Sequence, residues 1–151
     1  MANTQAMCTS FKGELLVGHH NFGTGVIRAA TTADSFKAAL FLASATINAA
    51  TTAYSTTGEV TGTNYTAGGV AVTFGTAPST NGTTAFVTPS ASITYTNVTL
   101  STAFDCVLLY NSTQSNKAVS VHTFGSQTVT AGTFTLTMPT NDSSTGLIRL
   151  A

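Results

Sequence analysis

The side chains in this sequence that can carry acid–base chemistry are few and lie far apart along the chain. They are five carboxylates, at Glu14, Asp34, Glu59, Asp105 and Asp142. Asp105 is the best candidate for a general base, because it stands in an otherwise apolar run where burial would raise its pKa. The alternatives for Asp105 are an outward position at a strand edge or a pair with Lys117.

Three histidines raise the question of a metal site. His19 and His20 together with His122 would supply three zinc ligands. Adjacent residues on an extended segment point in opposite directions, which argues against that geometry, and a single His122 on a threonine-rich strand is more typical of a surface residue. We therefore predict no metal site and no cofactor.

The sequence contains no recognisable catalytic motif. It has no nucleophile elbow, no His-Glu-x-x-His, no Cys-x-x-Cys and no phosphate-binding lysine loop. We predict that the chain is not an enzyme.

Composition excludes further classes of function. Only 7% of the residues are charged and the formal net charge is zero, while roughly a fifth are threonine. The five Lys and Arg residues are scattered, so binding to nucleic acid through phosphates is not expected. The apolar stretches are far shorter than the ~20 residues that cross a membrane. A neutral chain has little charge repulsion to keep it dispersed, so we expect it to work inside an assembly.

The two cysteines, Cys8 and Cys106, are too few for a disulfide framework. The apolar neighbours of Cys106 predict a small buried core residue. The N-terminal residues do not resemble a signal peptide, so we expect synthesis and folding in a cytoplasm.

Hydrophobic periodicity predicts a short N-terminal helix and then strands. Apolar spacing over residues 4–17 favours a helix that stops at Gly18, with a strand that begins at residues 15–17 as the alternative. The run 35–43 predicts a central strand, and residues 49–69 predict a long loop closed by the Gly68-Gly69 pair. Strands are then expected at 70–74, 93–98, 104–110, 118–123, 133–138 and 146–150, with a turn at 78–82.

This pattern predicts an all-β fold with a short N-terminal helix. Strands that recur at about 10–12-residue spacing are typical of an antiparallel β-sandwich or a jelly-roll-like domain. We predict one domain over residues 1–151, with residues 1–18 as the N-terminal helix or arm and residues 49–69 as the long loop.

Several segments of the chain resemble a family of small β-rich virion structural proteins of tailed bacteriophages. The matching stretches are Met7–Lys12, Phe36–Leu42, Thr51–Gly69, Leu109–Ser112, Asn116–Val121 and Ile148–Leu150. They follow the same order over most of the chain, and the block from Tyr54 to Gly69 is the most specific. The stretch Cys106–Leu108 departs from the family pattern, which puts a shared role for that strand's outer face in doubt.

The resemblance implies a non-enzymatic component of the phage virion, assembled in the bacterial host cytoplasm. We expect a capsid decoration or cement protein that stabilises the head shell by contacting the major capsid protein, as a homo-oligomer and specifically a trimer. The alternative is a tail, baseplate, tail-fibre or adaptor component of the phage particle. From a different class, a carbohydrate-binding β-sandwich would use tyrosines to stack on sugars, but the chain lacks tryptophan, the preferred residue for such stacking.

The residues expected to matter are therefore contact residues. We predict that Phe11, Leu15 and Leu16 anchor the N-terminal segment on a partner, with packing onto the chain's own core as the alternative. From the long loop we predict contacts through Tyr54, Glu59 and Tyr65.

Overall fold

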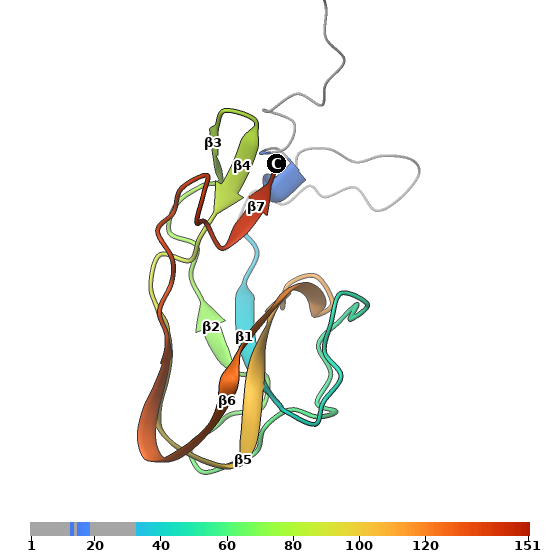
Figure 1. Ribbon diagram of the computed structural model, residues 1–151. Coiled ribbons are helices and arrows are strands. Elements are labelled where there is room, and N and C mark those ends of the chain that lie inside the picture. Colours follow the sequence, from blue (N-terminus) through green and yellow to red (C-terminus); the bar gives the residue numbers. More distant parts are fainter. Residues whose placement is uncertain (1–12, 14, 19–32) are drawn as a thin grey trace, which may run out of the picture. The chain divides into compact units, whose positions relative to one another are not determined.

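The computed structural model describes residues 13, 15–18 and 33–151 and confirms an all-β fold (Figure 1). The strands are β1 (Phe36–Leu42), β2 (Val70–Val72), β3 (Ser79–Asn81), β4 (Thr84–Val87), β5 (Ile93–Asn111), β6 (Lys117–Leu136) and β7 (Ile148–Leu150). Helical geometry within the described part is limited to Gly13 and residues 15–17. The more specific sandwich or jelly-roll architecture stays a prediction.

The described chain forms two compact units, each built on one antiparallel sheet. The large-sheet unit comprises residues 34–73 and 91–137, and its strand order is β2-β1-β5-β6. The small-sheet unit contains residues 74–90 and 138–151 with the described residues before 34, and its strand order is β3-β4-β7. The long loop of residues 49–69 belongs entirely to the large-sheet unit.

The core of the large-sheet unit follows from two apolar runs that were expected to be central strands. β1 lies between β2 and β5, and its residues Ala38–Phe41 are fully buried. The neighbouring part of β5, Cys106–Tyr110, is also buried on both faces. A strand buried on both faces is a continuous apolar run in the sequence, which is why both central strands were predicted correctly. Cys106, predicted as a core residue, is a buried free cysteine.

The four strands predicted between residues 93 and 138 are in fact two long strands, and that part of the prediction was wrong. β5 and β6 form one antiparallel hairpin whose register shifts at five places. At the shift between Tyr95 and Val98 the backbone φ of Asn97 is 52°, and at the next shift, on β6, that of Ala131 is 44°. Such bulges insert extra residues and bend a strand without ending it, so each one looks like a turn in the sequence pattern.

The small-sheet unit is a three-stranded sheet, and it corrects the predicted turn at 78–82. Ser79–Asn81 form strand β3, and the chain reverses at Gly82 and Thr83 before β4. The C-terminal strand was predicted correctly, since β7 pairs with β4 through Phe86 and Arg149. The side chain of Arg149 donates a hydrogen bond to the carbonyl of Ser144 and so fastens the preceding loop.

The N-terminal helix prediction is confirmed only at its end. Leu15, Leu16 and Val17 are helical, and the amide of Gly18 donates to the carbonyl of Leu15 at 3.2 Å while its φ is 75°. Glycine in this left-handed conformation is a common helix stop. Phe11, His19 and His20 lie outside the described residues. Among the described residues, no helix is long and apolar enough to cross a membrane.

Candidate functional site

Residues 51–69 of the predicted long loop close the edge of β1 that β2 leaves open. β2 pairs only with Phe36–Ala38. Beyond that point the loop continues the pairing: the amide of Val60 donates to the carbonyl of Leu40 at 3.0 Å, and the amide of Leu42 donates to the carbonyl of Gly58 at 2.9 Å. The loop is therefore an ordered element of the large-sheet unit, although it forms no regular strand.

Two glycines allow this loop to approach the sheet closely. Gly69 has a φ of 70°, and a Cβ there would lie 1.7 Å from the carbonyl oxygen of Ala38. At Gly62 a Cβ would lie 2.0 Å from the carbonyl oxygen of Thr99, whose backbone pairs with Thr63. Only glycine fits at such distances. Both residues of the Gly68-Gly69 pair, which was expected to close the loop, have positive φ.

The carboxylate of Glu59 is the centre of a buried hydrogen-bond network inside the loop. Its side chain is only 6% exposed. The hydroxyl of Tyr54 donates to Oε2 at 2.6 Å, while the hydroxyl of Tyr65 and the amide of Gly68 donate to Oε1 at 2.8 and 2.7 Å. Three donors around one carboxylate satisfy a charge that would otherwise be costly to bury. We call Glu59, Tyr54, Tyr65 and Gly68 the Glu59 cluster.

The other two tyrosines of the chain lock the Glu59 cluster onto the sheet. Tyr110 of β5 stacks on Tyr54 with ring centroids 4.6 Å apart and donates to the carbonyl of Gly68 at 2.8 Å. Tyr95 of β5 stacks on Tyr65 at 5.9 Å and donates to the carbonyl of Ala38 at 2.8 Å. All four tyrosines thus serve the attachment of the loop. Tyr95 and Tyr110 are each 2% exposed, so their rings offer no surface for stacking on a sugar.

The environment keeps these tyrosines protonated. Burial, followed by the hydrogen bond and negative charge of Glu59, raises the pKa of Tyr54 well above its usual value. Burial likewise raises the pKa of Tyr65 and Tyr95, and the charge of Glu59 adds to both shifts. The hydroxyls therefore remain hydrogen-bond donors throughout the physiological range, and the network does not titrate there through its tyrosines.

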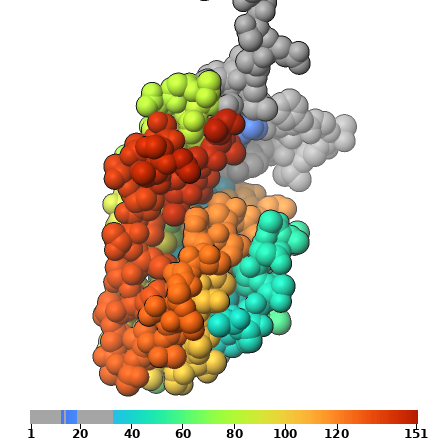
Figure 2. Space-filling model, viewed as in Figure 1, coloured from blue at the N-terminus to red at the C-terminus, as the bar shows by residue number. Residues whose placement is uncertain are grey.

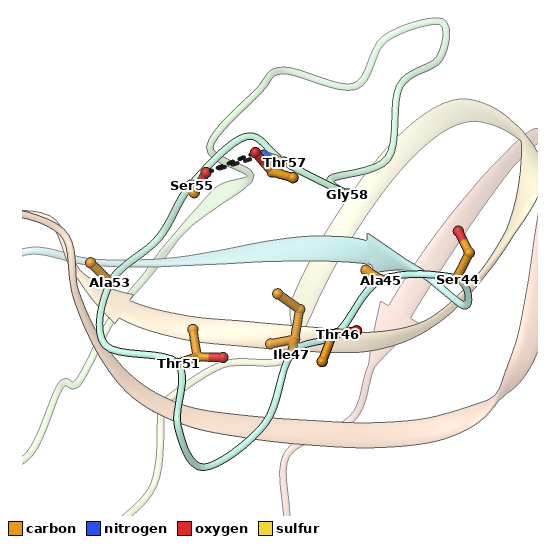
Figure 3. Close-up of a pocket in the computed structure, with 9 residues that line it drawn as sticks. All are labelled: Ser44, Ala45, Thr46, Ile47, Thr51, Ala53, Ser55, Thr57 and Gly58. Atoms are coloured by element: carbon orange, nitrogen blue, oxygen red, sulfur yellow. Dashed lines mark hydrogen bonds between the residues drawn. The ribbon is translucent and has the colours of Figure 1, made fainter.

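A shallow hollow lies beside the cluster, between residues 44–47 and 51–58 (Figure 3). Its volume is about 480 Å³, and the side chain of Ile47 lies between the two segments. The remaining lining is small or hydroxylated: Ser44, Ala45, Thr46, Thr51, Ala53, Ser55, Thr57 and Gly58. None of these nine residues is an acid or a base, so the hollow offers shape and hydroxyls and no proton-transfer group.

The residues singled out for catalysis or metal binding do not come together. Asp105 is half-buried on β5 and is hydrogen-bonded to Cys106, and burial together with that charge raises the pKa of the Cys106 thiol to about 11. His122 of β6 lies 2.9 Å from the hydroxyl of Ser120, and burial lowers its pKa. Within the part of the chain that the structure describes, no three His, Cys, Asp or Glu residues are grouped to hold a metal ion.

The structure brings together three of the six predicted contact residues. Tyr54, Glu59 and Tyr65 meet in the Glu59 cluster, where each has a role inside the loop; their contact with a partner stays a prediction. Leu15 is 40% exposed and Leu16 is half-buried. Tyr95 and Tyr110 hold the Glu59 cluster from β5, and their signal in the sequence was a tyrosine in each of two strand patterns.

Comparison of the chain with protein-family models, with curated proteins and with solved structures found no match.

Proposed function

We propose that this chain is a non-enzymatic structural protein of a bacteriophage virion, and within the virion a capsid decoration protein that binds the major capsid protein. The resemblance of its sequence to small phage virion proteins supports the proposal. Its low charge supports it too, because a protein covered by neighbours needs few charges for solubility.

The observation that carries the proposal is the way the loop of residues 51–69 is built. Its acidic and aromatic side chains turn inward to the Glu59 cluster, while a neutral set faces outward: Thr56, Thr57, Thr61, Thr63, Asn64, Thr66 and Ala67. A loop that is already fixed loses little conformational entropy on binding. Such a neutral, prearranged surface suits a permanent contact with another protein better than the capture of a charged ligand.

The first experiment is quantitative gel densitometry of purified particles against the major capsid protein. A decoration protein is present at a ratio near one to one and stays with the heads when tails are sheared off. A ratio of a few per cent that travels with detached tails would overturn the decoration role and favour the tail, baseplate or fibre-adaptor alternative. Absence from the particle would overturn the virion role altogether.

A binding experiment tests the loop surface directly. The purified chain is added to heads that lack it, and bound protein is measured after sedimentation. Thr61→Glu places a charge on the exposed loop and is expected to reduce binding at least tenfold, whereas Thr76→Glu, an equal charge change outside the loop, leaves binding unchanged. Equal binding by both variants would exclude the loop as the contact.

The predicted N-terminal anchor has its own matched pair. Leu15 and Val17 are 40% and 45% exposed on the same helical turn. Leu15→Ala is expected to weaken head binding while leaving the unfolding midpoint of the isolated chain unchanged, and Val17→Ala is the control. If Leu15→Ala lowers the unfolding midpoint and binding together, Leu15 packs on the chain's own core and the anchor prediction is wrong.

A further inference from the structure

β6 presents a long outer edge that no other described strand covers. It is the last strand of the large sheet, and it pairs with β5 along one side only. On its other side, only the first residues of β6 pair with described backbone: the amide of Ala118 donates to the carbonyl of Thr52 at 3.0 Å, and Lys117 forms a bridge with Ala53. Figure 2 shows the atoms of β6, in orange, over a large part of the visible face. A strand edge of this kind is a template for another strand.

The opposite side of the same sheet is treated differently. There β2 and the loop of residues 51–69 cover β1, so that the amide of Leu40 is bonded to the hydroxyl of Tyr65 at 3.0 Å and its carbonyl to the amide of Val60. The chain thus uses a long ordered loop to close one edge of the sheet. The edge at β6 is left open by the part of the chain that the structure describes.

The β6 edge also lacks the residues that usually prevent strand pairing. From Ala118 to Leu136 the sequence contains no Lys, Arg, Asp or Glu and no proline. Natural proteins protect exposed edges with such residues or with bulges. Here bulges interrupt the edge, but the four consecutive pairs from Ser120 to Thr123 with β5 are unbroken. Next to this unbroken stretch, at a register shift, Val119 is 41% exposed.

We propose that the β6 edge around Val121 pairs antiparallel with the same edge of a second copy of this chain. An uncharged strand meets no like-charge repulsion in pairing with itself, and a two-fold axis uses one patch on both subunits. Among the described strands only β5 and β6 are long, and β5 already has neighbours on both sides. With the two-fold axis at Val121, the exposed Val119 of one copy lies opposite Thr123 of the other copy.

The pairing goes beyond the proposed virion role and can be tested without it. A dimer that binds no phage head would leave the pairing intact and overturn the virion role. A monomer that decorates heads would do the reverse. The two-fold arrangement also differs from the trimer expected from the resemblance, so the measured mass separates the two.

The test is the mass of the isolated full chain in solution, measured by sedimentation or light scattering over a range of concentrations. We expect wild type to have twice the 15.4 kDa chain mass. The double variant V119K/T123K adds lysines at two exposed edge positions and should raise the dimer dissociation constant at least tenfold. The control T76K/A77K adds two lysines at exposed positions outside the large sheet and should leave the dimer intact.

Amide hydrogen exchange locates the contact. The amides of Val119–Thr123 should exchange more slowly as wild-type concentration rises, and this dependence should disappear in V119K/T123K. A wild type that stays monomeric, a trimer, or a dimer that persists in V119K/T123K would each overturn the proposal, as would loss of the dimer in the control. Circular dichroism checks folding, and Thr123→Lys alone replaces the double variant if that variant does not fold.

Discussion

Removing the hydroxyl of Tyr65 tests whether the loop of residues 51–69 is fixed to the sheet by buried hydrogen bonds. That hydroxyl donates to Glu59 at 2.8 Å and accepts from the amide of Leu40 at 3.0 Å. Tyr54 provides a matched comparison, because its hydroxyl also donates to Glu59, at 2.6 Å, but the backbone amide beside it, that of Gly68, keeps its own 2.7 Å bond to Glu59 when the Tyr54 hydroxyl is removed. Tyr65→Phe and Tyr54→Phe both keep the aromatic ring.

The difference between the two variants follows from the backbone donor. Each loses a hydrogen bond to a charged group, which contributes about 1.5–3 kcal/mol. Tyr65→Phe in addition leaves the amide of Leu40, a residue with 0% exposure, without its acceptor, and an unsatisfied buried donor costs about 1–3 kcal/mol. We therefore expect Tyr65→Phe to lower the free energy of unfolding by about 3–5 kcal/mol and Tyr54→Phe by about 2 kcal/mol.

Urea unfolding of both variants measures these values, with equal m-values as the sign that the comparison is valid. Hydrogen exchange adds a local measurement, because the amide of Leu40 should lose protection in Tyr65→Phe and keep it in Tyr54→Phe. If Tyr65→Phe costs no more than Tyr54→Phe, or if the amide of Leu40 stays protected, the hydroxyl is not what fixes the loop to β1 and the reasoning fails.

Three further predictions concern single residues. Gly69 has a φ of 70°, and a Cβ there would lie 1.7 Å from a carbonyl oxygen, so Gly69→Ala should lower the free energy of unfolding by about 3 kcal/mol or more. Gly82 has a φ of 57° but open space around it, so Gly82→Ala should cost only about 1 kcal/mol. Urea unfolding measures both values. Hydrogen bonds from Ser144 and Thr145 lower the pKa of Asp142 below its ordinary 3.8, so this stabilisation is present above pH 3.8 and is lost on further acidification. The free energy of unfolding should therefore depend less on pH between pH 5 and pH 2 in Asp142→Asn than in wild type. An unchanged pH dependence would contradict this. Burial raises the pKa of Cys106 to about 11, so its thiol is protonated and unreactive at pH 8. In a Cys8→Ser chain, a thiol reagent at pH 8 should therefore label Cys106 only after urea is added. Rapid labelling of the native chain would show that this thiol is accessible.

The central strands could be predicted because a strand buried on both faces has apolar residues at nearly every position. Residues 35–43 and 104–110 are apolar almost without interruption, and both lie in the middle of the large sheet. The half-buried end of β6 was equally readable, since Phe134 and Leu136 are partly buried while Thr133 and Thr135 are exposed. In each case the side-chain period of a strand decided the result.

Strand length could not be predicted, because bulges change the period without ending the strand. Ile93 and Tyr95 are buried in phase, but the next buried residue is Val98 and not Asn97. The positive φ of Asn97 absorbs this change of phase while pairing with β6 continues. In the sequence, the same change reads as the end of one strand and the start of another.

The Glu59 cluster could be predicted only in part. Its loop members stood out because a carboxylate and two tyrosines are unusual in a threonine-rich stretch. A loop without a period gives no sign of which side chains turn inward, so their burial could not be inferred. Tyr110 joins through the pairing of β1 with β5, and Tyr95 through its hydrogen bond to the carbonyl of Ala38, so both contacts bring together residues far apart in the chain.

The two edges of the large sheet link the low charge of the chain to its expected mode of action. A sheet that works alone in water needs both edges protected, and this chain protects one of them with four tyrosines, a buried carboxylate and glycines that no larger residue could replace. An equally elaborate device at β6 is absent from the described residues, although a few lysines would suffice there. The same shortage of charges that leaves β6 open also leaves the outer face of the loop neutral. A chain of this kind is best stabilised when like or complementary neutral surfaces cover it, which is why we expect its oligomeric state and its virion contacts to depend on these two surfaces.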